Sequence, residues 1–211
     1  MVRIIEVKGN DDGLPAGQKE DPMLKIIGIA MVVLIAAVLV YAATRPDTFR
    51  FERTASIKAP PEKIFPYLSD FRKREAWSPY EKKDPAMKRA YSGAAGGKGS
   101  VYEFDGNKEV GKGRLEIIET APPSRVVISL DMFKPFEGHN IVEYTLEPKG
   151  DSTNFTWAIH GRNSYLAKLM CLFVSMDKMI NRDFEAGIAS LKAVVEKQAA
   201  PILSLPGRGQ R

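Results

Sequence analysis

Aromatic side chains are the residues of this sequence whose types and spacing best suit binding chemistry. Two of them flank a serine and a proline, and four others form two pairs that alternate with polar residues in segments that favour β-strands. Because alternate residues of a strand face the same side of a sheet, each pair would share one face. Large rigid rings on such a face could line a cavity for an apolar ligand. These candidate ligand-binding residues are Trp77, Tyr80, Tyr102, Phe104, Phe155 and Trp157.

A second group of candidates lies on an apolar stripe near the C-terminus. From 164 to 197, apolar residues recur every three or four positions, which is the spacing of one face of a helix. Phe173, Met176 and Ile180 belong to this stripe, and methionine is flexible enough to adapt to ligands of different shape. Both groups have a simpler interpretation as ordinary core, because most buried aromatic side chains pack against one another.

Groups that could transfer protons are few. The two histidines, His139 and His160, have no carboxylate at a spacing that would tune them, so we expect both to be exposed. Four acidic residues alternate with apolar neighbours, as they would on the solvated face of a sheet: Glu103, Glu116, Asp131 and Glu143. The sequence therefore names no catalytic residue. An inward-facing carboxylate, histidine or tyrosine with a hydrogen-bond partner would favour an enzyme.

Composition argues against metal, disulfide and nucleic-acid chemistry. One cysteine and two histidines are too few for an internal disulfide or a Cys/His zinc site. The glycine-rich segment 93–100 is no phosphate-binding loop, because Lys98 precedes a glycine and a predicted strand instead of serine or threonine and a helix. The net charge of +5 is spread along the chain, which disfavours nucleic acid as a partner. We expect no metal and no cofactor.

One segment is far more apolar than the rest. Residues 26–43 contain no charged residue, and about 20 apolar residues are enough to cross the hydrocarbon core of a bilayer. The sequence therefore predicts a transmembrane helix at 23–44, after a disordered tail at 1–22. A cleavable signal peptide that starts at Met23 is the alternative, but the apolar run is longer than such a peptide needs. Whether translation begins at Met1 or Met23 stays open.

The orientation of this predicted single-pass anchor is weakly encoded. The flanking basic residues are balanced: Arg3, Lys8, Lys19 and Lys25 precede the segment, and Arg45, Arg50, Arg53 and Lys58 follow it. A short tail, one span and a large C-terminal domain form the usual layout of an anchor that exports its domain. We therefore expect the domain on the outer, periplasmic face of the membrane.

The remaining sequence predicts one α+β domain at 45–197. Alternation from 49 to 57 predicts a strand, and the proline pair before Glu62 is typical of a helix start. Short alternating runs broken by Gly, Pro and Asn predict an antiparallel meander from 87 to 161. The stripe at 164–197 predicts one long helix packed on that sheet, and the prolines and glycines of 198–211 predict a flexible tail.

Several of these segments together resemble a known superfamily. They are residues 57–65, Trp77-Ser78-Pro79-Tyr80, Asp84-Pro85, Tyr91-Ser92-Gly93, Gly97–Tyr102, Pro122-Pro123, Lys134-Pro135-Phe136, Thr153–Trp157 and Asp183–Lys192. Residues 49–197 resemble the SRPBCC superfamily, also called the START or helix-grip fold, and within it the bacterial polyketide cyclase/dehydrase-like branch. The resemblance implies a curved antiparallel sheet wrapped around a long C-terminal helix, with an apolar cavity between them.

The resemblance leaves three functions open, because members of the superfamily include lipid carriers, polyketide cyclases and chaperone activators. We expect a membrane-anchored protein that binds an apolar small molecule, such as a lipid or an isoprenoid-like compound. A cyclase or dehydratase is the second possibility, and it requires a proton-transferring group inside the cavity. A protein-interaction module is the third, and it requires an exposed hydrophobic patch.

Overall fold

The computed structural model describes residues 22–173 and 176–199. The chain divides into two compact units, Met1–Thr44 and Arg45–Arg211. The predicted tails at 1–22 and 198–211 lie almost entirely outside the described residues, except that Pro22 begins a helix and residues 198 and 199 end one. The two units are described separately below.

The first unit contains one helix, α1 (Pro22–Ala43), within its described part. This helix is apolar on all sides, with Lys25 as its one charged residue, so it has no polar face to turn toward water. It is long and apolar enough to cross a membrane, although a signal sequence has the same properties.

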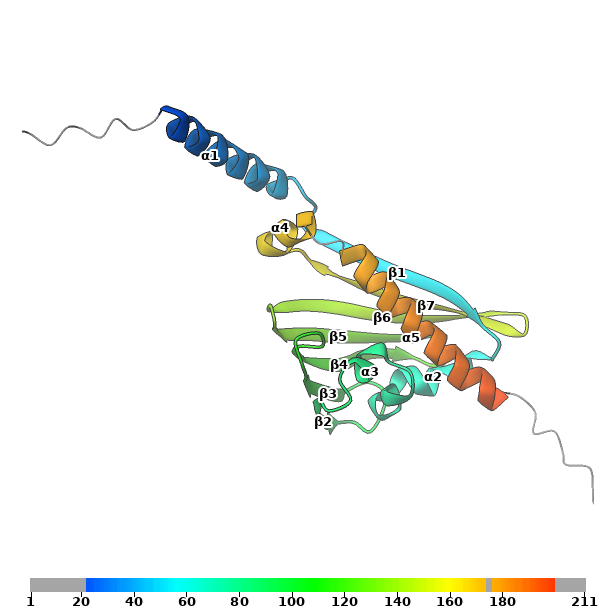
Figure 1. The fold of residues 1–211 in the computed structure, drawn as a ribbon. Coiled ribbons are helices and arrows are strands. Elements are labelled where there is room, and N and C mark those ends of the chain that lie inside the picture. Colours follow the sequence, from blue (N-terminus) through cyan, green and yellow to red (C-terminus); the bar gives the residue numbers. More distant parts are fainter. Residues whose placement is uncertain (1–21, 174–175, 200–211) are drawn as a thin grey trace, which may run out of the picture. The chain divides into compact units, whose positions relative to one another are not determined.

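The second unit contains a seven-stranded antiparallel sheet (Figure 1). The strand order across the sheet is β1-β7-β6-β5-β4-β3-β2, so every pair of neighbours except β1 and β7 is also consecutive in the chain. The strands are β1 (Thr48–Ile57), β2 (Lys88–Gly93), β3 (Ser100–Asp105), β4 (Lys112–Ala121), β5 (Arg125–Lys134), β6 (Gly138–Lys149) and β7 (Ser152–Arg162). The predicted antiparallel meander is confirmed.

Alternating burial along the strands explains why the sheet has a single packed face. Phe155 and Trp157 on β7 are buried, as are their register partners Leu146 and Tyr144 on β6. The residues between them are more exposed and face away from the core. This period of two is the pattern that a half-buried antiparallel sheet requires.

Four further elements cover the packed face (Figure 1). They are α2 (Pro61–Ser69), the 3-10 helix η1 (Phe71–Ala76), α3 (Pro79–Lys83) and α5 (Met176–Ala199). Asp70 accepts a hydrogen bond from the backbone N–H of Arg72 at 2.9 Å and so caps η1, as its position between two apolar segments suggests. Pro79 occupies the first turn of α3, where its missing N–H costs nothing.

The C-terminal region differs from the single helix predicted for 164–197. The structure has two helices there, α4 (Tyr165–Phe173) and α5, with residues 174 and 175 outside the described part. The physical difference lies in their surfaces: α4 exposes Leu166 and buries Lys168, whereas α5 follows a regular apolar stripe through Phe184, Ile188 and Leu191. The grip helix is therefore α5 alone.

A stacked pair of rings fixes α5 against the sheet. The rings of Trp157 on β7 and Phe184 on α5 lie 4.2 Å apart at 15°. One turn further along, Gly187 allows an unusually close approach, because a Cβ added there would lie 2.6 Å from Cζ3 of Trp157 and 3.0 Å from Cδ of Pro79. The helix, β7 and α3 therefore meet at this point.

Candidate functional site

The predicted ligand-binding residues lie mainly inside the domain. Trp77, Tyr102, Phe155 and Trp157 are at most 3% exposed. Tyr80, Phe104 and Ile180 are half-buried and pack against the same core. The side chains of Phe173 and Met176 lie outside the described residues, so their predicted role remains a prediction.

The buried rings form two groups, and the rings within each group are in contact. In the first, Trp77, Tyr144 and Trp157 pack edge to face, with ring centroids 5.4 to 6.0 Å apart. In the second, Tyr102 lies 5.9 Å from both Phe71 and Phe104. These rings fill much of the space under the helices, so a ligand could enter only if some of them moved.

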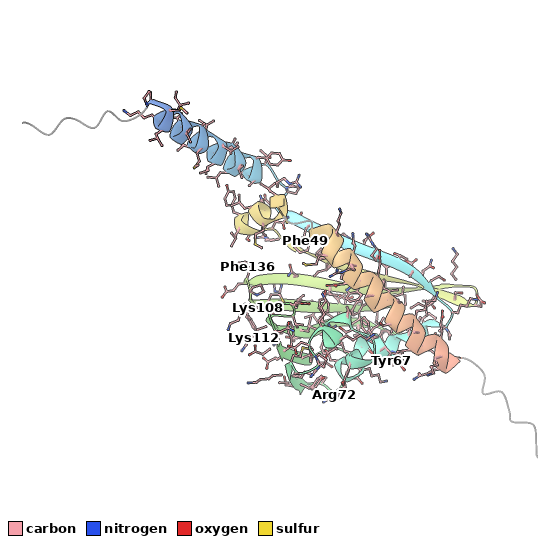
Figure 2. The ribbon with its side chains drawn as sticks, viewed as in Figure 1. Phe49, Tyr67, Arg72, Lys108, Lys112 and Phe136 are labelled. Carbon is pink, nitrogen blue, oxygen red and sulfur yellow. The ribbon has the colours of Figure 1, made fainter. Side chains whose placement is uncertain are left out.

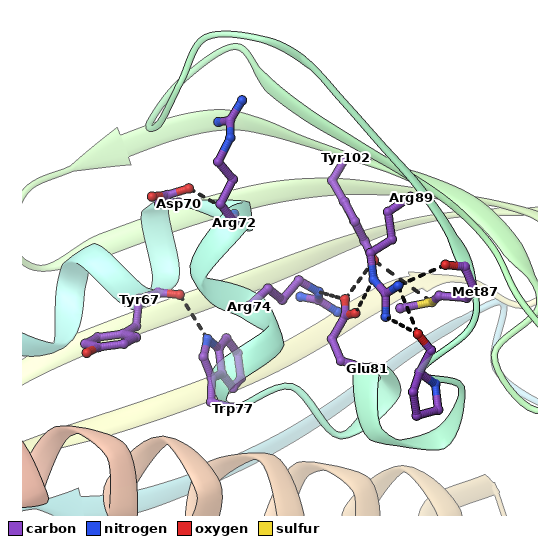
Figure 3. Close-up of polar contacts among 10 residues, drawn as sticks. Tyr67, Asp70, Arg72, Arg74, Trp77, Glu81, Met87, Arg89 and Tyr102 are labelled. Carbon is purple, nitrogen blue, oxygen red and sulfur yellow. Dashed lines mark hydrogen bonds and ion pairs between the residues drawn. The ribbon is translucent and has the colours of Figure 1, made fainter.

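A buried carboxylate lies beside these rings (Figure 3). The side chain of Glu81 is 3% exposed. Its Oε2 accepts a hydrogen bond from Nε of Arg89 at 2.8 Å, and its Oε1 accepts one from the Tyr102 hydroxyl at 2.7 Å. Nε of Arg74 lies 4.0 Å from Oε1, within ion-pair range but beyond hydrogen-bond range.

Local structure places these groups together. Glu81 is in the first turn of α3, and Arg74 is in η1. Arg89 comes from the edge strand β2 and Tyr102 from its neighbour β3. The Arg89 guanidinium also donates to the backbone carbonyl oxygens of Pro85 and Met87. The carboxylate therefore joins the helical cover to one edge of the sheet.

The charges in this cluster do not balance. Two guanidinium groups share one buried carboxylate, and the nearby Glu75 is exposed and acts weakly on Arg89. The Arg74 side chain is 11% exposed, and its buried Nε has no hydrogen-bond partner within the described part of the chain. A buried cationic donor without a partner is costly, so this group is suited to holding an anionic or carbonyl oxygen.

Two tyrosines lie close to Arg74. Burial raises the pKa of the Tyr80 hydroxyl, and the negative charge of Asp183 raises it further. Burial also raises the pKa of Tyr144, while the adjacent Arg74 guanidinium opposes that shift. Both hydroxyls therefore stay protonated at neutral pH and are available as hydrogen-bond donors.

Four other buried polar side-chain atoms lack partners among the described residues. They are Oγ of Ser78, Oγ of Ser100, Nε1 of Trp157 and Oδ1 of Asn181. Ser78 is fully buried and Trp157 is 3% exposed. Buried polar atoms are nearly always paired in folded proteins, so these atoms mark places where water or a ligand would bind.

A groove of about 310 Å³ runs between α3 and α5. Its lining residues are Pro79, Lys82, Lys83, Arg182, Asp183, Ala186 and Ser190. Two contacts hold its walls together: Nζ of Lys83 lies 2.6 Å from Oδ2 of Asp183, and Nζ of Lys82 donates to Oγ of Ser190 at 2.8 Å. Because Asp183 also acts on Tyr80, the groove is adjacent to the polar cluster.

Sequence reasoning missed the charged part of this site. It proposed Tyr80 and Tyr102 but not Arg74, Glu81 or Arg89. Those three are charged residues in a lysine- and arginine-rich stretch, and the sequence pattern of such a stretch predicts solvent-exposed side chains. The available signal was the position of Glu81 in the first turn after Ser78-Pro79, where an acid on a very short helix can face inward.

The expectation that neither histidine has a carboxylate partner is wrong. Nδ1 of His139 lies 2.6 Å from Oδ1 of Asp131, because the two residues are directly opposite on β5 and β6, and Nε2 of His160 lies 3.9 Å from Oε1 of Glu143. Cross-strand pairing is invisible to spacing along one strand. The His139 side chain is nevertheless 67% exposed, as predicted, and lies on the surface of the domain.

Comparison with known proteins agrees with this architecture. The family described as "Polyketide cyclase / dehydrase and lipid transport" matches residues 48–196. The chain belongs to this family. No protein in the curated set matches the sequence.

Solved structures similar to this family member share its fold. Protein CV1439 from Chromobacterium violaceum has a TM-score of 0.51 and 18% identity, over 72% of this chain and 99% of its own. The di-domain ARO/CYC StfQ from the steffimycin biosynthetic pathway has a TM-score of 0.53 and 10% identity, over 72% and 52%. DynU16, a putative protein in the dynemicin biosynthetic locus, has a TM-score of 0.50 and 14% identity, over 73% and 49%. The predicted helix-grip fold is confirmed.

Replacing the shared carboxylate tests the polar cluster. Glu81→Gln leaves the half-buried guanidinium groups of Arg74 and Arg89 without their shared counter-charge, and we expect it to lower the free energy of unfolding by about 3 kcal/mol. Chemical denaturation followed by circular dichroism measures this change. The exposed Glu103 on β3 provides the control, since Glu103→Gln should cost less than about 0.5 kcal/mol. Equal effects of the two variants would contradict the account.

Alkaline pH tests the buried tyrosines. Tyr80, Tyr102 and Tyr144 have pKa values above their ordinary 10.0, with burial as the largest cause for each. As pH rises, the tyrosine hydroxyls of the unfolded chain therefore lose their protons before those of the folded chain. Their contribution to the free energy of unfolding is fully present below pH 10, and above pH 10 it falls by up to about 1.4 kcal/mol per pH unit for each tyrosine. Denaturation from pH 8 to pH 11 measures the slope. Tyr102→Phe should reduce it, and an unchanged slope would contradict the assignment.

Proposed function

We propose that this protein binds an apolar small molecule, a lipid or an isoprenoid-like compound, between its sheet and α5. The observation that carries this proposal is the buried Nε of Arg74, a cationic donor with no hydrogen-bond partner among the described residues. A domain that needed only a stable core would gain by replacing such a group with an apolar one. Retaining it is consistent with a ligand that completes the pairing.

The surroundings of Arg74 define the kind of ligand. The rings of Trp77, Tyr144 and Trp157 supply an apolar wall, which favours a hydrocarbon chain or ring system. The guanidinium and the hydroxyls of Tyr80 and Tyr144 supply donors at one place within that wall. An amphiphile with one carboxylate, phosphate or carbonyl head and an apolar body fits both parts.

Entry of the ligand is proposed to occur between α3 and α5. The groove there is closed by the Lys83–Asp183 ion pair and the Lys82–Ser190 hydrogen bond. Separation of these contacts would free α5 from α3 near Gly187, where the helix, Trp157 and Pro79 are in closest contact. A few hydrogen bonds of this kind can open on the timescale of ligand exchange.

The apolar helix α1 supports a membrane-anchored form of this binding protein. As an uncleaved single-pass anchor it would hold the domain beside membrane-dissolved ligands and raise their effective concentration. We place the domain on the outer face of the membrane, following the usual layout of a signal anchor.

An enzymatic function is the second candidate, and one observation favours it. Tyr80 and Tyr144 remain protonated next to a guanidinium, an arrangement that could stabilise the oxyanion of an enolising carbonyl and donate a proton to it. The family description names cyclases and dehydrases beside lipid transport. A cyclase would bind its substrate transiently, whereas a carrier retains its ligand.

Native mass spectrometry tests the proposal. The full chain, extracted from membranes in a mild detergent, should carry a bound mass of a few hundred daltons. In Arg74→Met, the affinity for this molecule should fall at least about tenfold and the occupied fraction should drop with it, since a charge-assisted hydrogen bond contributes about 1.5–3 kcal/mol. Arg72→Met is the matched control, because Arg72 lies in the same short helix with an exposed side chain.

The result distinguishes the two candidates. Loss of the bound mass in Arg74→Met, with retention in Arg72→Met, supports the carrier. A wild-type chain that is empty but converts an added polyketide-like substrate supports the enzyme. A chain that is empty and inactive, or that binds equally well in all three forms, contradicts the role assigned to Arg74.

A further inference from the structure

We propose that one end of the domain docks on the surface of an anionic phospholipid bilayer, with Phe133 and Phe136 in the interface and three lysines against lipid phosphates. This inference rests on the membrane anchoring proposed above. We call this part the docking end, and it comprises the β3–β4 loop, the β5–β6 loop, the start of β1 and helix α4.

The register of the sheet places these segments at the same end. Thr48 pairs with Arg162, so β1 begins where β7 ends. Asn140 at the start of β6 pairs with Gly161, and Gly138 pairs with Met132 near the end of β5. At this same end of the sheet, Lys112 at the start of β4 pairs with Lys134 at the end of β5 and with Asp105 at the end of β3. Figure 2 shows Phe49, Lys108, Lys112 and Phe136 at this end of the domain.

Apolar side chains are exposed at the docking end. Phe133 and Phe136 are 47% and 51% exposed; Phe133 is the second-last residue of β5, and Phe136 is in the three-residue link between β5 and β6. Leu166 on α4, the helix that follows the end of β7, is also 53% exposed. Several large apolar side chains exposed together indicate an interaction surface, and phenylalanine and leucine partition into the boundary between headgroups and acyl chains.

A basic hollow lies directly beside the two phenylalanines. It has a volume of about 570 Å³ and is lined by Asp105, Gly106, Asn107, Lys108, Gly111, Lys112, Lys134 and Pro135. Three of these residues are lysines and one is an acid, and Nζ of Lys112 already pairs with Asp105 at 3.0 Å. This pairing lowers the pKa of Asp105, and Lys134 and Lys88 act in the same direction. The lining carries a net positive charge that suits a lipid phosphate.

The length of the connecting chain favours a bilayer as the occupant. Helix α1 ends at Ala43 and β1 begins at Thr48. Five residue steps span at most about 18 Å, whatever orientation the two units take. If α1 is a membrane span, the start of β1 must therefore stay near the bilayer surface. Apolar residues beside lysines at this end then have lipids within reach.

Tryptophan quenching by brominated lipids tests the docking. We propose to reconstitute the full chain into vesicles of phosphatidylcholine and phosphatidylglycerol, with and without dibrominated acyl chains. The natural Trp77 and Trp157 are 1% and 3% exposed, so they give a protected background. In Phe136→Trp, the added fluorescence should be quenched several-fold more than in Asp151→Trp, which labels the turn at the opposite end of the sheet.

Charge variants and extraction complete the test. Replacing Lys108, Lys112 and Lys134 by glutamine in the Phe136→Trp background should reduce the quenching in anionic vesicles. Equal quenching of the Phe136→Trp and Asp151→Trp variants, or none in either, overturns the docking. Resistance of the wild-type chain to carbonate extraction reports the anchor independently, so docking can fail while anchoring stands. Extraction by carbonate would contradict the anchor itself.

Discussion

Glu81 is the residue on which the organisation of the interior depends. Its buried carboxylate accepts hydrogen bonds from Arg89 and Tyr102 and lies 4.0 Å from Nε of Arg74. A carboxylate in this position would be unstable without those partners, and the two guanidinium groups would be unstable without it. The short elements η1 and α3 are therefore held to the edge of the sheet by one shared charge, which leaves a positive charge beside the buried rings.

This imbalance connects the fold to the proposed function. A sheet covered by helices supplies an apolar interior, but apolar packing alone gives no preference for one end of a ligand. The Arg74 guanidinium, with Tyr80 and Tyr144 beside it, provides that preference. In the proposed function, a membrane-dissolved molecule reaches the interior through the groove between α3 and α5. The chain belongs to a family whose description includes lipid transport.

The sequence predicted the periodic parts of the structure well. Strands such as β6 and β7 were predictable because their burial alternates, and α5 because its apolar residues recur at helical spacing. Tyr80 and Tyr102 were proposed for the site because they are aromatic. Arg74, Glu81 and Arg89 were missed because pairing between η1, α3 and β2 depends on tertiary contacts, and the Asp131–His139 pair depends on strand register. Charged residues carry no periodic signal when a short helix turns one of them inward.

Nuclear magnetic resonance of the arginine side chains tests the central claim most directly. The full chain, labelled with ¹⁵N-arginine in nanodiscs, should show a marked shift of the Arg74 Nε–H signal when a fatty acid such as oleate is added. The Arg89 Nε–H signal should stay in place, because this N–H already donates a hydrogen bond to Oε2 of Glu81 at 2.8 Å. An Arg74 signal that does not move at saturating oleate, while signals of exposed arginines do, would contradict the claim that the Arg74 Nε–H, which has no hydrogen-bond partner among the described residues, receives the ligand.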